Sequence, residues 1–152
     1  MNGVEVYSAN VSDDCVGDVL SEDEERRASK FVVTLAAAEF RQGRVLLRTV
    51  LGEALGVLPQ DVPIEIDEFG RPYIAGNPVH FSVSHSGGHV RLAVANEPVG
   101  IDIQVKDRAI EEGMTAVFAT AREQAWVDSE ERFYDLWVRK EAVLKCFGTG
   151  FR

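Results

Sequence analysis

The 152-residue sequence contains only two cysteines and three histidines, and it has no long apolar run. Cys15 and Cys146 lie far apart and outside any CxxC pattern, so we expect neither a zinc site nor a disulfide framework. His80, His85 and His89 lie close in sequence but without an HExxH or Cys/His grouping, which argues against a transition-metal site. The chain lacks a stretch long enough to cross a bilayer and a secretory signal pattern. We therefore expect no membrane association and a cytoplasmic location.

The charge of the chain is acidic overall but unevenly distributed. A net charge of −9 argues against general nucleic-acid binding. Between positions 26 and 48, however, the sequence contains six basic residues and only one acid, Glu39. Those basic residues are Arg26, Arg27, Lys30, Arg41, Arg44 and Arg48. They are typical either of solvated helix faces or of a local anion site on an acidic protein.

The order of the expected elements indicates an α+β fold with an antiparallel sheet. Capping boxes at Ser21–Glu24 and Thr120–Glu123 mark two helix starts, and Gly56 suits a helix end. Gly87-Gly88 is typical of a hairpin turn. The expected elements are helices over 21–33 and 36–55, strands over 62–66, 69–74, 79–86, 89–95 and 99–105, a short helix after 120 and a helix over 137–147.

Two carboxylates could form a metal site. In VGIDIQV (99–105), strand alternation places Asp102 and Gln104 on one face, and Gly100 on the same face allows close approach. On the expected final helix, Glu141 and Lys145 are one turn apart. Mg²⁺ takes oxygen ligands and is often held by one or two carboxylates with phosphates and waters. The alternative is a solvated strand face and an ordinary Glu–Lys surface pair, worth about 0.3–0.5 kcal/mol.

The segment SVSHSGG (82–88) is a candidate for anion binding. Ser84, His85 and free backbone N–H groups of the glycine turn could together hold a phosphate. The same residues are also compatible with a hairpin whose histidine is merely exposed. Taken with the carboxylates and the basic helices, this segment points to a polyphosphate bound together with a metal ion.

The order of several motifs resembles the 4′-phosphopantetheinyl transferases of the surfactin-synthetase-activating type. The hallmark of that family is a G-[IV]-D strand followed, a few tens of residues later, by W-x-x-K-E-A-x-x-K-x-x-G. Here the first reads Gly100-Ile101-Asp102, and the second runs from Trp137 to Gly148 as WVRKEAVLKCFG. The likeness covers roughly positions 21 to 150 and includes RRASKF, FGRPYI, FSVSHSGG and VFATAREQAW.

The resemblance implies a transferase activity, a bound Mg²⁺ ion, coenzyme A as co-substrate and a carrier protein as partner. Members of the family transfer the phosphopantetheine arm of coenzyme A to a serine of an acyl or peptidyl carrier protein, with Mg²⁺. The family fold has two similar α/β lobes with coenzyme A and metal between them. On this basis residues 1–102 would form the first lobe, and residues 103–152 would form the start of a second, incomplete lobe.

The resemblance also implies roles for individual residues. Asp102 and Glu141 would hold Mg²⁺, and Glu141 would take the proton of the attacking carrier serine. Lys145 would offset phosphate charge. Contacts to coenzyme A would come from Ser84, His85 and Arg71, and less securely from Lys30, Arg41 and Arg44. Gln104 stands where the family often has Glu, so we expect a weaker or differently tuned metal site at this position.

The chain ends two residues after Gly150, which we interpret as a truncated second lobe. Its last helix would then expose apolar residues such as Leu144 and Phe147. The main alternative to an active transferase is a non-catalytic coenzyme A-binding or structural fragment. A third possibility, an unrelated acidic α+β interaction domain, requires every motif to be coincidental.

Overall fold

The computed structural model describes residues 3–12, 19–68, 70–76, 79–107, 110–111 and 113–148. In chain order its strands are β1 (Glu5–Asn10), β2 (Glu65–Ile66), β3 (Pro72–Tyr73), β4 (His80–Ser86) and β5 (His89–Ala95). Its α-helices are α1 (Glu22–Ala28), α2 (Thr34–Leu55), α3 (Met114–Phe118), α4 (Ala121–Trp126) and α5 (Glu130–Phe147), with a 3₁₀ turn over Pro59–Asp61. This mixture of helices and antiparallel strands confirms the predicted α+β class.

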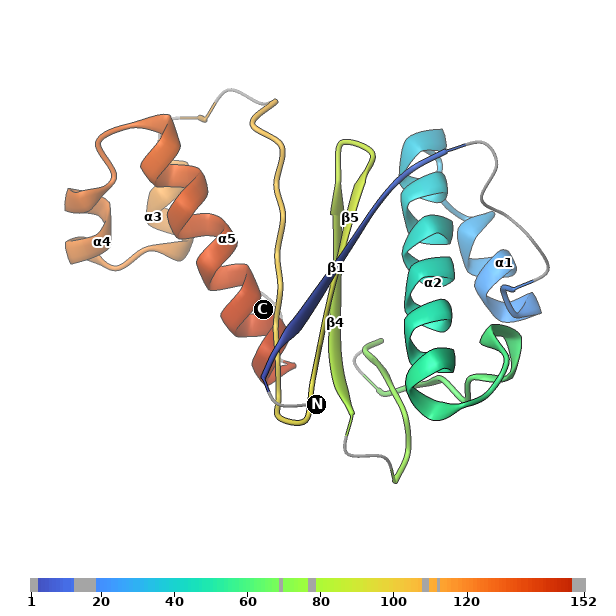
Figure 1. Cartoon of the computed structure of the whole chain (residues 1–152). Helices are drawn as coiled ribbons and strands as arrows, with labels where there is room; N and C mark the ends of the chain where they lie inside the picture. Colours follow the sequence, from blue (N-terminus) through green and yellow to red (C-terminus); the bar gives the residue numbers. More distant parts are fainter. Residues whose placement is uncertain are drawn as a thin grey trace.

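A three-stranded antiparallel sheet of order β1-β5-β4 forms the middle layer. The helices α1 and α2 cover one face of this sheet, and α5 lies on the other side (Figure 1). Alternate residues of β5 point to the two faces. Leu92 and Val94 join Leu47 and Leu51 of α2 in the main core, whereas Ala93 and Ala95 pack with Val99 on the opposite face. The sheet therefore separates the α1–α2 layer from α5.

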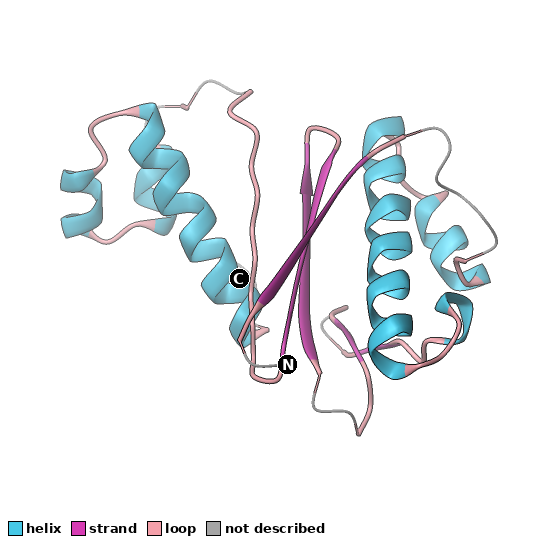
Figure 2. Cartoon of the chain, in the orientation of Figure 1, coloured by secondary structure: helices cyan, strands magenta, loops and turns pink. Residues whose placement is uncertain are grey.

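The segment over 99–105 differs from its prediction as a strand. It is extended, but it makes no backbone ladder and is drawn as a loop between the sheet and α5 (Figures 1 and 2). The serine hydroxyls of β4 take the place of a neighbouring strand. Ile101, Ile103 and Val105 donate their backbone N–H groups to Ser82, Ser84 and Ser86, respectively, at 3.2, 3.3 and 3.1 Å. The predicted alternation of side chains holds, while the predicted strand does not.

Helix boundaries follow their capping signals closely. Both predicted capping boxes form, at Ser21–Glu24 and at Thr120–Glu123. Gly56 and Gly148 end α2 and α5 with φ of 68° and 73°, the left-handed geometry that glycine adopts without strain.

Other boundaries were wrong, each for a local reason. The first helix ends at Ala28 and does not reach residue 33, because Val32 and Val33 are exposed and have no core to face. The final helix starts at Glu130, seven residues before its expected start, because Ser129 caps it through the Arg132 N–H.

A strand, an α-helix and the 3₁₀ turn over Pro59–Asp61 escaped prediction among the described residues. The strand β1 pairs with β5, but most of its residues are exposed, so its sequence carries only a weak alternating signal. The five-residue α3 has no side-chain cap to announce it. The predicted strands over 62–66 and 69–74 shrink to the two-residue strands β2 and β3, and residue 69 lies outside the described residues. None of the described helices is both long and apolar enough to cross a membrane.

Candidate active site

The candidate site lies where the 99–105 segment is pressed between β4 and α5. Its close packing against the helix requires a glycine at position 100. A Cβ atom at Gly100 would lie 1.8 Å from the Ala142 carbonyl oxygen and 2.6 Å from the Cys146 nitrogen. Both distances are far below any real Cβ contact, so only glycine lets the segment approach the helix backbone this closely. Gly100 thereby places Asp102 beside the helix that carries Glu141 and Lys145.

Asp102 and Lys145 form a close ion pair with Ser84. The Lys145 Nζ lies 2.5 Å from Asp102 Oδ1 and 2.9 Å from Ser84 Oγ. The Ser84 hydroxyl donates to the same Asp102 oxygen at 2.7 Å. The Asp102 side chain is only 7% exposed, whereas that of Lys145 is 29% exposed. The cluster therefore has a buried carboxylate with its ammonium partner at the solvent boundary.

Glu141 belongs to the same electrostatic group. Burial raises the pKa of Glu141 above its usual value, and the neighbouring Asp102 charge raises it further, while Lys145 acts in the opposite direction. Glu141 lies one turn before Lys145 on α5, and Lys145 is the residue that pairs with Asp102. The structure therefore pairs Asp102 with Lys145 and places Glu141 on the preceding turn of α5. The sequence spacing predicted only that Glu141 and Lys145 share one face of a helix.

The donor set suits a cation that is only partly held by protein. Over the described part of the chain, no group of three or more His, Cys, Asp or Glu side chains is placed to hold a metal ion. Two carboxylates with oxygen donors fit Mg²⁺, which usually completes its octahedron with phosphates and waters. The third predicted ligand, Gln104, is half-buried, and its amide nitrogen donates to the Val105 carbonyl at 3.2 Å.

Ser84 and His85, which we expected to act together on a phosphate, lie on opposite faces of the sheet. Ser84 points toward Asp102, whereas His85 Nδ1 lies 3.0 Å from Glu39 Oε2 on α2. Glu39 also accepts the Gly88 N–H at 2.7 Å. The expectation that this glycine offers a free N–H to a phosphate was therefore wrong, because the buried Glu39 carboxylate already binds it.

Arg71 connects the β2–β3 hairpin to the end of α5. Its Nη1 donates to the Cys146 carbonyl at 3.4 Å. It also lies against Gly148, where an added Cβ would be 2.9 Å from the same nitrogen. Such a cationic contact satisfies a helix-end carbonyl and complements the negative end of the helix dipole. Arg71 is thus placed on the α5 side of the molecule, where Lys145 occupies the last helical turn.

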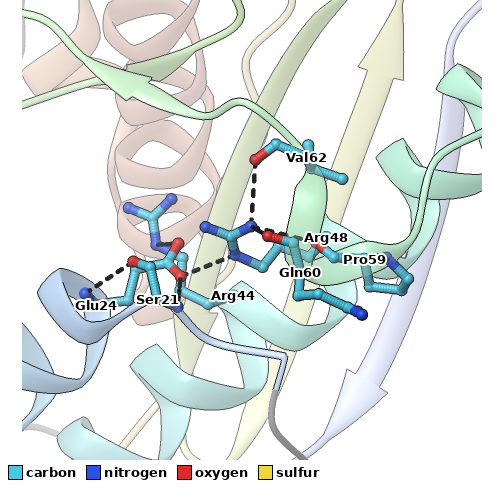
Figure 3. A network of polar contacts seen from close by, with 7 residues as sticks. All are labelled: Ser21, Glu24, Arg44, Arg48, Pro59, Gln60 and Val62. Atoms are coloured by element: carbon cyan, nitrogen blue, oxygen red, sulfur yellow. Dashed lines mark hydrogen bonds and ion pairs between the residues drawn. The ribbon is translucent and has the colours of Figure 1, made fainter.

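The basic residues of α1 and α2 are largely neutralised by acids of α1. Arg48 donates to Glu24 at 2.8 Å and to three backbone carbonyls, those of Pro59, Gln60 and Val62 (Figure 3). Arg44 lies 3.7 Å from the same carboxylate, and burial lowers its pKa. The Arg44 Nη1 is nevertheless a buried donor without a hydrogen-bond partner.

Arg41 and Lys30, the remaining predicted phosphate contacts, differ in whether an acid already pairs with them. Arg41 pairs with Glu25 at 3.0 Å, whereas Lys30 is exposed and makes no ion pair within the described residues. All three candidates on this layer, Lys30, Arg41 and Arg44, belong to α1, α2 or the turn between them. They lie across the sheet from Asp102 and α5 (Figure 1).

Sequence reasoning missed Glu39 and the two flanking serines, Ser82 and Ser86. The sequence analysis noted Glu39 only as the single acid in a basic stretch. A lone acid in such a stretch is itself a sequence signal for a structural partner. The alternating serines of FSVSHS were visible in the sequence. Their use as acceptors for a neighbouring extended segment was not, because it depends on the tertiary approach of residues 101–105.

Comparison with known proteins places residues 10–152 in one family. Residues 98–152 match the 4′-phosphopantetheinyl transferase superfamily, and residues 10–97 match the family described as 4′-phosphopantetheinyl transferase, N-terminal. A 4′-phosphopantetheinyl transferase of Bacillus subtilis is 34% identical over 116 residues, which make up 71% of this chain and 51% of that protein.

Two further relatives cover more of the chain. The 4′-phosphopantetheinyl transferase gsp of Aneurinibacillus migulanus is 28% identical over 137 residues, or 86% of this chain and 57% of that protein. The 4′-phosphopantetheinyl transferase HetI of Nostoc sp. is 32% identical over 143 residues, or 86% of this chain and 60% of that protein. The chain thus spans little more than half the length of the curated relatives it matches.

Proposed function

The chain belongs to the 4′-phosphopantetheinyl transferase family, and on that premise we propose that it transfers the 4′-phosphopantetheine arm of coenzyme A to a serine of an acyl or peptidyl carrier protein. The observation that supports this proposal most is the ion pair of Asp102 with Lys145 between β4 and α5, with Glu141 one turn before Lys145 on the same helix. Two carboxylates and an ammonium match the charges of a bound pyrophosphate and cation.

In the proposed reaction the carrier serine oxygen attacks the phosphorus that bears the pantetheine arm. The bond to the adenosine-bearing phosphate breaks, and adenosine 3′,5′-bisphosphate leaves. Glu141 accepts the serine proton, directly or through a water, and its raised pKa makes it a stronger base than an ordinary glutamate. Lys145, on the next turn of α5, is placed to offset the negative charge that builds up on the phosphate groups.

Asp102 and Glu141 would hold Mg²⁺, and Gln104 would stand beside them as an uncharged neighbour. The cation, when bound, neutralises the pyrophosphate and stabilises charge on the departing group. Asp102 suits this role because its carboxylate is fixed by two donors and cannot rotate freely. Contacts to the coenzyme would come from Arg71 on the α5 side and from His85, Lys30, Arg41 and Arg44 on the other layer.

Mass spectrometry of an apo carrier protein tests the proposal. The carrier is incubated with coenzyme A, Mg²⁺ and this chain, and we expect it to gain the mass of phosphopantetheine. Glu141→Ala should abolish the gain. Glu131→Ala is a matched control on the same helix, because its side chain is 85% exposed and its nearest cation, Lys106, is 4.0 Å away.

Two results would count against the transferase. Binding of coenzyme A to the chain without any transfer, with acyl and peptidyl carriers alike, would favour a non-catalytic coenzyme A-binding protein. Neither binding nor transfer would leave the chain with family membership and no activity of this kind.

A further inference from the structure

The hydroxyl of Ser84 has used its full hydrogen-bonding capacity inside the protein. A serine hydroxyl offers one donor and two acceptor positions. The Ser84 proton goes to Asp102 Oδ1 at 2.7 Å, and its oxygen accepts from Lys145 Nζ at 2.9 Å and from the Ile103 N–H at 3.3 Å. The residue is only 5% exposed. A phosphate could gain a hydrogen bond from this hydroxyl only if Asp102 lost one.

Resting on the function proposed above, we propose that Ser84 is a positioning residue. In this role it fixes the Asp102 carboxylate and the Lys145 ammonium relative to each other and does not bind a phosphate of coenzyme A. The resemblance to the family suggested a phosphate contact for this residue. The geometry points instead to an acceptor for Lys145 and a donor to Asp102 in a single buried group.

The two neighbouring serines show that this role is specific to position 84. Ser82 and Ser86 each accept one backbone N–H from the 99–105 segment, as Ser84 does. Ser84 alone also joins Asp102 to Lys145. Ser82 is as well buried as Ser84 (8% and 5% exposed), so it provides a control that loses a similar backbone contact and leaves the ion pair untouched.

Loss of the hydroxyl should loosen the pair. In Ser84→Ala, Asp102 Oδ1 loses one of its two donors and Lys145 loses one of its two acceptors. The ammonium is then held only by the carboxylate, on a flexible stem at the solvent boundary. Outer partners that fix a metal-binding carboxylate typically change metal affinity or activity by about 10- to 100-fold when they are removed.

The first test needs neither metal nor substrate. The rate at which acetic anhydride labels Lys145 at fixed pH is measured by peptide mass spectrometry, with the exposed Lys30 as an internal reference. We expect Lys145 to be labelled about threefold faster or more in Ser84→Ala than in wild type. This ratio corresponds to a modest part of the free energy of one hydrogen bond to a charged group. Ser82→Ala keeps the Ser84 hydroxyl, and Ser84→Thr replaces it with a threonine hydroxyl. In both variants Lys145 should be labelled at the wild-type rate. An unchanged rate in a folded Ser84→Ala protein would overturn the inference.

The second test separates the two roles of Ser84 by their effects on binding and turnover. A positioning role predicts that Ser84→Ala binds coenzyme A in EDTA within about twofold of wild type while kcat for transfer falls about 10- to 100-fold. A direct phosphate contact predicts the opposite: weaker binding in EDTA and little change in kcat. The second pattern would overturn the inference. A wild-type chain that transfers nothing would count against the proposed function alone, and the labelling rate would still decide the role of Ser84.

Discussion

Gly100 illustrates how a single residue sets the geometry of the site. The glycine brings its backbone against the carbonyl of Ala142, one residue after Glu141. Asp102, two residues further along, therefore reaches the helix face that carries Lys145. The carboxylate is useful at this position only because position 100 has no side chain.

Gly100→Ala is therefore expected to be strongly destabilising. The added methyl would meet the helix backbone itself, which cannot rotate away as a side chain can. We expect a loss of about 3 kcal/mol in the free energy of unfolding, measured by urea denaturation, together with faster labelling of Lys145. Gly43→Ala is the control, since its nearest contact is a side-chain methyl of Val83 at 3.3 Å and not helix backbone. Its cost should be within about 1 kcal/mol, because alanine also favours the helix. Equal losses in the two variants would contradict the packing described.

Among the elements, α1 and α2 are joined by a buried ion network centred on Glu24. The carboxylate caps its own helix through Ser21 and also accepts from Arg48, whose side chain is 5% exposed. The basic stretch between residues 26 and 48 thus serves in large part to hold these helices together. Neither of the two uses considered from the sequence, solvated helix faces or a local anion site, describes this role fully.

Removing a buried residue of this network should lower the free energy of unfolding far more than removing one residue of a partly exposed ion pair. Arg48→Ala would leave the buried Glu24 carboxylate without its closest cation and remove one donor from each of three carbonyls, for an expected loss of about 3–5 kcal/mol in the free energy of unfolding. Arg41→Ala removes the more exposed pair with Glu25 and should cost about 1 kcal/mol or less. Chemical denaturation of both variants measures the difference. Similar losses would show that burial does not govern this network.

The contact between α4 and α5 should make stability depend on pH in the acid range. The hydrogen bond from Lys140, followed by the Thr120 backbone and side chain, lowers the pKa of Glu123 from 4.5 to about 2. A lowered pKa in the folded state means stability that is complete above pH 4.5 and is lost as the pH falls toward 2. Melting temperatures of wild type and Glu123→Gln should therefore differ at pH 6 and converge near pH 2. A constant difference across that range would show that Glu123 does not titrate as described.

At the scale of the whole molecule, the sheet divides the predicted contacts into two groups. Asp102 pairs with Lys145 on α5, which also carries Glu141, and Arg71 reaches the end of α5 from the β2–β3 hairpin, whereas Lys30, Arg41, Arg44 and His85 belong to or contact the α1–α2 layer. Apolar side chains on α5 also remain exposed, with Phe147 75% and Val143 53% exposed, while Leu144 is half-buried. The expectation of exposed apolar residues on the last helix thus holds for Phe147.

The sequence singled out Asp102, Glu141 and Lys145 more successfully than it predicted the residues around them. Helical spacing was sufficient to pair Glu141 with Lys145, and the G-I-D motif was sufficient to single out Asp102. The sequence analysis assigned Ser84 and His85 to one phosphate, although strand alternation sends neighbouring side chains to opposite faces. Their partners could not be predicted, because Glu39 and Lys145 lie 46 and 61 residues away in the chain. The serine contacts that replace a strand ladder likewise depend on distances that no local pattern contains.

The central claim is that the carboxylates of Asp102 and Glu141 converge on one divalent cation. Anomalous diffraction from crystals grown with coenzyme A and Mn²⁺ tests it most directly, because manganese scatters anomalously and takes the same oxygen ligands. We predict one strong anomalous peak about 2.1 Å from an oxygen of each carboxylate. A peak bound by only one of them, or a manganese ion located elsewhere with both carboxylates free of it, would contradict the claim.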